Sequence, residues 1–462
     1  MKIIYSFAYI LLICAPLQVL NSQNIVINEI LASNVSANAD EDGDHEDWVE
    51  LFNAGSTSVN LAGYGLTDDP SQPLKWVFPN ITIEPGGYKL VWCSDKNRVN
   101  PSNPLHANFK ISSGVESVYL NNASGTQVVM AAAMSTPADV SYGKSPNGTG
   151  PFLYFEIPTP GAINNTTAYT SILPPPVFSH PAGFYTTGFD LTISTSVAGA
   201  SIIYTLDGSE PEQSNLGGTT YNYKNQYPEL PGQPVGPMLS KSFTTLSYTA
   251  PVSIVDRTSQ PNKIASISST YDFVPEYIPS SSIFKGTVVR AKVIKPGAIS
   301  TEAASRTYFV TPVGASRFSL PVISFGISEN KLYDFEDGIY VAGIDYENWR
   351  IQNPTTEPYY IEDIANFFRR GIDNERVANM SYFVNGTEVI NQDVGIRISG
   401  GSSRAWQNKS LAIHSRDEYG DETLDYTFFP NQPTNFKGLI LRNSGSDFFE
   451  TMFRDALCHN LM

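Results

Sequence analysis

Short segments in which apolar and polar residues alternate recur along the first third of the chain, each followed by a cluster of turn-forming residues. Examples are Ile25–Ile30, Trp48–Phe52 and Tyr88–Trp92, separated by turn signals such as Asn53–Gly55 and Glu84–Gly87. Alternation with a period of two places every second side chain on the same face of a strand, and short strands at this spacing pack as two facing sheets. The pattern therefore predicts a β-sandwich over residues 24–161.

The composition agrees with strands and turns and excludes several classes of protein. The 462 residues include 34 Gly, 32 Pro, 25 Tyr and 25 Phe, a profile typical of short strands rather than long amphipathic helices. With 29 Lys and Arg against 45 Asp and Glu, the net charge is −16, which argues against non-specific binding of nucleic acid or anionic lipid. The three cysteines, Cys14, Cys93 and Cys458, lie far apart, which excludes a disulfide framework and a cysteine-based zinc site.

Residues 1–22 are predicted to be a cleaved secretory signal peptide. Lys2 precedes a short apolar run that Pro16 and Gln18 interrupt, and Asn21–Gln23 is polar. A run of about ten residues fits a signal peptide better than a membrane span of roughly 20 residues. A retained N-terminal anchor is the alternative. Because no later stretch is long and apolar enough to span a bilayer, we expect a secreted protein or one at the extracellular surface.

Residues 162–175 are expected to be a linker, and a second β region is predicted from 176 to 310. Its expected strands are Phe189–Ser194, Ser201–Leu206 and Thr287–Val293. The stretch 212–285 is rich in Tyr, Pro, Ser and Gly and departs from the compact pattern. We therefore expect it to be an insertion in a second sandwich.

The third region, residues 317–462, mixes strands with a helix. Asp447 and Glu450 have the spacing of a capping box, and apolar positions 449, 452, 453, 456 and 457 share one helical face. The pattern predicts a helix up to Leu457. The expected strands are Leu320–Phe325, Ile339–Val341, Asp393–Ser399 and Lys409–His414.

Four motifs in the first region carry a family resemblance, and Pro158–Gly161 follows them. The motifs are Val26–Ile30, Asp47–Asn53, Val59–Asp69 and Ile83–Tyr88. Their order and spacing resemble the bacterial lamin-tail domain, an immunoglobulin-like sandwich in which Pro-Thr-Pro-Gly is the usual exit. Such domains are accessory or adhesive modules, so the resemblance implies no chemistry.

The second region contains Tyr-Thr-Leu-Asp-Gly-Ser-Glu-Pro at 204–211 and Lys-Pro-Gly at 295–297. These residues resemble the C-terminal β-sandwich of chitobiase and β-hexosaminidase. That module lacks the glycosidase active site, so the resemblance implies no hydrolase activity.

The third region resembles the N-terminal part of the spore coat protein H (CotH) kinase family. The residues that carry the resemblance are Leu320–Ser324, Gly338–Val341, Gly395–Arg404, Lys409–Leu411, Phe428–Pro430, Leu441–Gly445 and Arg454–Asp455. The resemblance implies ATP-dependent phosphorylation of Ser or Thr on a protein acceptor, with Mg or Mn. The family's metal-binding and catalytic Asp residues lie further downstream, beyond Met462, so we expect a truncated domain that is inactive alone.

The combined expectation is a mainly β multidomain chain. Two immunoglobulin-like sandwiches precede a truncated α+β atypical kinase-like domain. The alternative is a non-enzymatic adhesive or carbohydrate-binding surface protein, in which the third region is a degenerate binding fold and Trp or Tyr residues contact glycans.

Phosphoryl transfer requires cations on the nucleotide phosphates. Lys409, on an expected strand after a Gly-Ser turn, is the first candidate, and Arg397, Arg404 and Arg442 are rivals because a guanidinium also fits phosphate. Glu450 could position the lysine. The alternative is that Lys409 and Glu450 are surface charges, with Glu450 only capping its helix.

An acidic run in the first region is a candidate calcium site. Between residues 40 and 50 most side chains are carboxylates, among them Asp40, Asp42, Asp44 and Asp47. Calcium prefers several oxygen ligands, although the spacing is not that of an EF-hand. A solvated acidic loop is the alternative.

Overall fold

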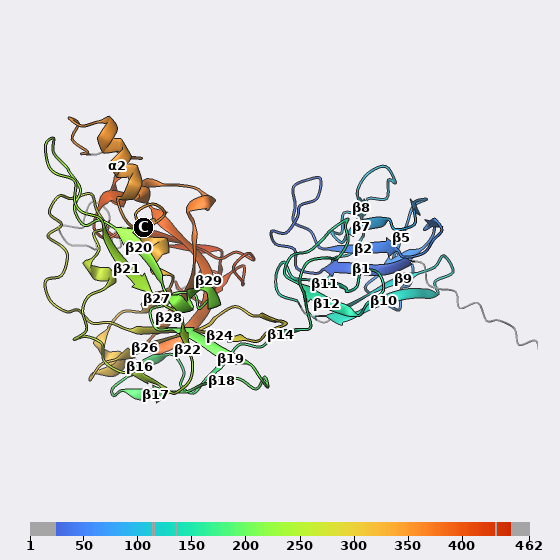
Figure 1. Cartoon of the computed structure of the whole chain (residues 1–462), viewed down its shortest axis with the longest axis horizontal. Helices are drawn as coiled ribbons and strands as arrows, with labels where there is room; N and C mark the ends of the chain where they lie inside the picture. Colours follow the sequence, from blue (N-terminus) through green and yellow to red (C-terminus); the bar gives the residue numbers. More distant parts are fainter. Residues whose placement is uncertain are drawn as a thin grey trace, which may run out of the picture. The chain divides into compact units, whose positions relative to one another are not determined.

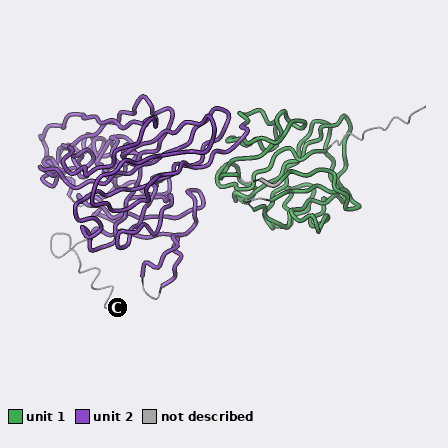
Figure 2. The backbone as a smooth tube through the Cα atoms, turned by 90° about the horizontal axis from the view of Figure 1, so that it is seen from below, with its two compact units in different colours: residues 1–168 green, residues 169–462 purple. Residues whose placement is uncertain are grey.

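The computed structural model describes residues 25–444, except residues 113, 115, 135, 360, 430 and 431. The chain forms two compact units, residues 1–168 and 169–462, coloured green and purple in Figure 2. The expected boundary between residues 310 and 317 therefore does not separate compact units. The predicted signal peptide at 1–22 and the predicted helix that starts at Asp447, with Glu450, lie outside the described residues.

The first unit consists of short strands (Figure 1). They are β1 (Ile25–Leu31), β2 (Trp48–Asn53), β3 (Val59–Asn60), β4 (Gly65–Thr67), β5 (Trp76–Val77), β6 (Thr82–Ile83), β7 (Tyr88–Trp92), β8 (Leu105–His106), β9 (Glu116–Asn121), β10 (Gln127–Met134), β11 (Ser141–Lys144), β12 (Phe152–Phe155) and β13 (Ala168–Tyr169). One sheet has the order β13-β12-β11-β1-β2-β7-β8, another has the order β10-β9-β4-β5, and β3 pairs with β6. The three strands expected in this region are confirmed as β1, β2 and β7.

The apolar face of each sheet is buried against the other. Ile27 and Val49 from the larger sheet and Val118 and Leu120 from the smaller one belong to a single core and have no exposed surface. The unit is therefore a β-sandwich, as the alternating pattern predicts.

A buried polar network ties the end of this unit to its first two strands. The register between β1 and β2 shifts at Asn28, so both Asn28 and Glu29 are buried. Glu29 accepts hydrogen bonds from the backbone and hydroxyl of Thr159, and Glu50 accepts one from the backbone of Gly161 at 2.5 Å. Burial raises the pKa of Glu50 to about 8. The polar residues of the lamin-tail-like motifs thus hold the exit segment in place.

The second unit contains the remaining elements. The strands are β14 (Ser171–Leu173), β15 (Val177–Phe178), β16 (Gly183–Tyr185), β17 (Phe189–Leu191), β18 (Ile193–Ser194), β19 (Ser201–Thr205), β20 (Thr219–Tyr223), β21 (Leu239–Phe243), β22 (Leu246–Ser247), β23 (Val252–Ile254), β24 (Thr287–Ile294), β25 (Ala298–Ser300), β26 (Ala304–Val310), β27 (Val322–Gly326), β28 (Arg376–Val384), β29 (Thr387–Ser399), β30 (Ser410–His414), β31 (Leu424–Asp425), β32 (Asn435–Phe436) and β33 (Gly438–Leu441). Among the described residues of this unit, the α-helices are α1 (Glu329–Tyr333) and α2 (Gly343–Gln352).

The second sandwich is built around the sheet β16-β26-β24-β19-β22, with the pairs β17-β23 and β15-β18. Strands β22 and β23 lie within residues 212–285, so that stretch is not a single insertion. Its other parts pack on the third region, where Tyr227 shares a core with Tyr346 and Phe367. Tyr271 packs against the same core.

The third region forms an antiparallel sheet in the order β27-β28-β29-β30-β33. Its expected strands are found in β27, β29 and β30, but the strand expected at Ile339–Val341 is wrong. These residues form bends before α2, and Ile339 and Val341 are buried in two different cores. A short apolar run is buried whether it forms a strand or a bend, so its pattern does not distinguish these two conformations. No helix in the described part of the chain is long and apolar enough to cross a membrane.

Candidate functional sites

The acidic loop between β1 and β2 surrounds a lysine side chain. The ammonium of Lys96 lies 2.5 Å from Asp40, 2.9 Å from Asp42 and 2.7 Å from Asp44. Arg98 contacts Asp42 at 2.6 Å. Hydrogen bonds from Arg98, which has the larger effect, and from Lys96 lower the pKa of Asp42 to about 2. The cation that these carboxylates contact in the structure is therefore supplied by the chain itself.

The loop is also braced by its own backbone. One oxygen of Asp40 accepts hydrogen bonds from the backbone N–H groups of Asp42 and Asp44, at 2.9 and 3.0 Å. Burial raises the pKa of Asp40, but these bonds and the one from Lys96 outweigh it, and the pKa is lowered. Asp40 is therefore a structural centre of the loop as well as a ligand candidate.

Asp47 does not join this group. Its carboxylate accepts a hydrogen bond from the backbone of Asn34 at 3.1 Å, and burial raises its pKa to about 6. Two groups of side chains in the described residues have ligand atoms close enough for a metal ion, Asp40 with Asp42 and Asp44, and Asp40 with Glu41 and His106. Calcium remains a prediction, and it would have to compete with Lys96 for the first group.

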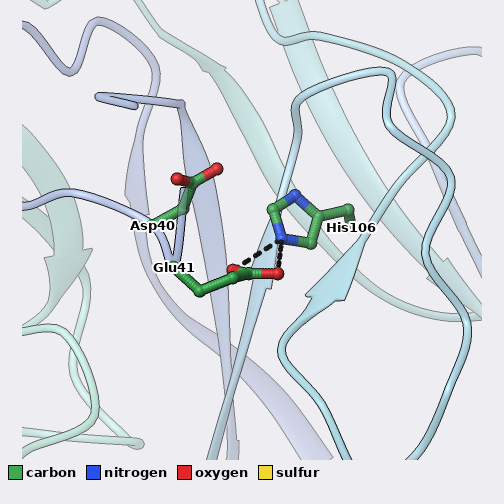
Figure 3. A group of neighbouring side chains, drawn as sticks. All are labelled: Asp40, Glu41 and His106. Atoms are coloured by element: carbon green, nitrogen blue, oxygen red, sulfur yellow. Dashed lines mark hydrogen bonds and ion pairs between the residues drawn. The ribbon is translucent and has the colours of Figure 1, made fainter. Parts of the chain in front are cut away.

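His106 belongs to β8, and its ring points toward Glu41 of the loop, as Figure 3 shows. One ring nitrogen contacts both oxygens of Glu41, at 3.0 and 3.1 Å, and the other contacts the hydroxyl of Ser94 at 2.8 Å. The Ser94–His106–Glu41 connectivity resembles that of an acyl-transfer triad. His106 is fully buried and Ser94 is only 5% exposed. This burial indicates that the contacts among the three residues brace the loop and that Ser94 does not attack a substrate. Sequence spacing gave no signal for it, because the three residues lie on separate segments.

In the third region, the outer face of the sheet carries arginines around a hollow. Residues 396 and 398 of β29 point into cores, so the alternate side chain, Arg397, lies on the opposite face. Arg370, Arg397, Arg404 and His414 line a hollow of about 510 Å³. The site brings together two of the predicted arginines with two residues that sequence patterns did not reveal.

Glu375 fixes the geometry of this face. Its carboxylate is fully buried and accepts a hydrogen bond from Arg416 at 2.9 Å, while Arg397 lies 4.0 Å and His414 3.8 Å away. Burial raises the pKa of Glu375, but the bond from Arg416 and its charged neighbours outweigh burial and lower it. Burial lowers the pKa of His414, and the nearby Glu375 opposes this shift.

Lys409 and Arg404 are placed differently from the expectation. The ammonium of Lys409 donates hydrogen bonds to the carbonyls of Arg404 and Trp406, at 2.5 and 3.0 Å, and lies 3.9 Å from the centre of the Phe367 ring. Burial lowers its pKa well below the usual range. Lys409 therefore anchors the turn after β29. Arg404 is 6% exposed, and its guanidinium donates to the carbonyls of Gly400, Phe367 and Arg369.

Comparison with known families identifies two parts of the chain. The Lamin Tail Domain model matches residues 18–134, and the Chitobiase/beta-hexosaminidase C-terminal domain model matches residues 180–259. No curated protein and no solved structure matches the chain. Neither family match reaches residues 317–462, so the CotH-like kinase stays a prediction. The chain is a multidomain β protein in which residues 18–134 are similar to the lamin tail domain and residues 180–259 to the chitobiase/beta-hexosaminidase C-terminal domain.

Proposed function

We propose that the chain is an exported protein, secreted or at the cell surface, whose third region contains the nucleotide-binding sheet of a CotH-like protein kinase domain. The reaction is ATP-dependent phosphorylation of Ser or Thr on a protein acceptor. The observation that carries the proposal is the arginine-lined hollow on the outer face of the five-stranded sheet.

Arg397 is the best-placed phosphate ligand of this face. Its side chain is 32% exposed, whereas Arg404 is buried among carbonyls and Lys409 is fully enclosed. A guanidinium presents two parallel N–H groups to phosphate oxygens, and such charge-assisted bonds are stronger than neutral ones. Arg370, which is half exposed, supplies a second cation at the rim.

Mg or Mn has no identified ligand set here. The described residues of the third region contain no cluster of three metal-ligating side chains, and Glu375 is already engaged by Arg416 and Tyr419. The described residues of the third region therefore do not fit a divalent metal. What they provide is electrostatic stabilisation of phosphate groups.

Nucleotide binding by the full chain tests the proposal. A fluorescent ATP analogue should bind the wild type, and Arg397→Gln should weaken binding at least tenfold. Lys437→Gln is the matched control, since Lys437 is 80% exposed and outside the hollow. Absence of binding to the wild type, or equal binding by Arg397→Gln, would reject the nucleotide site and favour the non-enzymatic adhesive alternative.

A further inference from the structure

We propose a second binding site, a pocket that takes a neutral pyranose unit of a polysaccharide. It lies between the residues around Tyr271 and the turn that follows β29, and encloses about 350 Å³. This volume is at the small end of the range of ligand pockets, about 300–1,000 Å³. The pocket shares none of its lining with the arginine-lined hollow.

Aromatic rings form one part of the lining. Tyr271, Tyr359 and Trp406 all contribute, and Tyr359 is 72% exposed. Tyr271 is held rigidly, because its ring is parallel to Tyr346 at 5.0 Å and its hydroxyl donates to the carbonyl of Pro358. The negative face of an aromatic ring attracts the weakly positive C–H face of a pyranose. An exposed ring beside a fixed one is therefore a platform for a sugar.

Hydrogen-bonding groups form the other part. Asp272, Glu229, Ser402 and Gln407 line the pocket. Thr270 also lines it, but it is 3% exposed and its hydroxyl already contacts that of Tyr277 at 3.0 Å. Carboxylates accept hydrogen bonds, hydroxyls can donate and accept, and an amide offers both donors and acceptors. Ring hydroxyls of a sugar need this mixture of partners.

The charge of the pocket selects among ligands. Its lining contains two carboxylates and no Lys or Arg. Acidic sugars would meet like charges, so they are disfavoured. A small organic ammonium would satisfy the carboxylates and the rings but would leave the hydroxyl and amide groups unused. A neutral sugar uses every type of group present.

Lys409 keeps the pocket wall in place. Its ammonium holds the carbonyls of Arg404 and Trp406, which precede Gln407 in the same turn. Ser269 donates to the carbonyl of Gln407 at 2.8 Å, which joins the turn to the segment that carries Asp272. The pocket is therefore preorganised by buried contacts on both sides.

Calorimetric titration of the full chain tests the site. The probes are cellohexaose, laminarihexaose and chitohexaose, with hexagalacturonate and choline as charged comparisons. At least one neutral hexasaccharide should bind saturably, and both Tyr359→Ala and Asp272→Asn should weaken it at least tenfold. Phe429→Ala is the control, because Phe429 is 53% exposed and outside the pocket. Binding of the ATP analogue should be unchanged, which separates this site from the proposed kinase function.

Three results would overturn the inference. They are a failure of all three neutral hexasaccharides to bind, equal affinity of the wild type and Tyr359→Ala, and binding of hexagalacturonate or choline in place of the neutral probes. Tyr359→Ala removes a ring that is 72% exposed, and its melting temperature is measured beside the affinity. Should Tyr359→Ala unfold, Asp272→Asn, which preserves the shape of the side chain, decides the question alone.

Discussion

At the scale of single residues, Lys96 balances three carboxylates in the loop between β1 and β2. Asp40 has a side chain with no exposed surface, so its charge depends on Lys96 and on backbone N–H groups. A buried group that loses its partner costs about 1–3 kcal/mol. Lys96 is therefore a structural cation, and its removal should destabilise the whole first unit.

We predict that Lys96→Met lowers the free energy of unfolding by about 1–3 kcal/mol at pH 7 in the presence of chelator. Calcium should restore part of the loss, because the oxygens of Asp40, Asp42 and Asp44 are close enough to share an ion. The pKa of Asp42 is lowered from 3.8 to about 2, so its contribution is present above pH 3.8 and disappears as the pH falls toward 2. The difference in free energy of unfolding between the wild type and Lys96→Met should therefore shrink as the pH falls from 3.8 toward 2.

Thermal melts of both proteins with calcium and with chelator give the measurement. Lys110→Met is the control, since Lys110 is 62% exposed and contacts only Glu46 of this loop, at 3.2 Å. If calcium raises the melting temperature of the wild type as much as that of Lys96→Met, the ion displaces Lys96. That result would support the calcium prediction made from the sequence.

At the scale of elements, β29 joins the core of the third region to its polar face. Ile396 and Ile398 are buried, whereas Gly395 and Arg397 lie on the other side. A Cβ atom on Gly395 would lie 2.1 Å from a carboxylate oxygen of Glu375. Gly395 is therefore required so that the carboxylate can lie against the strand.

We predict that Gly395→Ala destabilises the second unit by about 1–3 kcal/mol, because the methyl group displaces Glu375 and its bond to Arg416. It should also weaken binding of the ATP analogue, since Glu375, which lies 4.0 Å from Arg397, would no longer hold that guanidinium in position. Gly217→Ala is the control, because a Cβ there meets no atom within 4 Å. Urea unfolding and nucleotide titration give the two measurements, and a variant as stable as the control would contradict this role of Gly395.

The strands of the chain could be predicted better than its candidate sites. Alternation and turn residues locate β1, β2, β7 and β24 almost to the residue, because local pattern decides which side chains are buried. The partners of Lys96, Lys409 and Glu375 could not be predicted in the same way. Lys96 lies more than 50 residues from its carboxylates, and the burial of Lys409 depends on Phe367 from a distant segment. Such contacts are decided by tertiary packing, which periodicity does not encode.

At the scale of the molecule, the second sandwich and the third region share cores and buried ion pairs. Arg290 of β24 contacts Glu210 at 2.7 Å and Asp393 of β29 at 3.6 Å, and its side chain is 6% exposed. Tyr221 donates to Glu329 at 2.9 Å, and Lys224 pairs with Glu347. A break at residues 310–317 would therefore leave charged and aromatic groups of both parts without partners.

We predict that residues 317–462 expressed alone do not fold, whereas residues 169–462 fold as one cooperative unit. The third region would expose Phe335, Tyr346 and Phe367, because Tyr227 belongs to the same core and Tyr271 packs against it. Burying an aromatic side chain of this size contributes about 1.5–3 kcal/mol, which is a large share of the stability of a domain. Circular dichroism and urea unfolding of the two fragments give the measurement, with residues 25–168 as a control that should fold by itself. A cooperative transition in residues 317–462 would show that the third region is an independent domain, as its sequence resemblance implies, and that the shared core is only an interface.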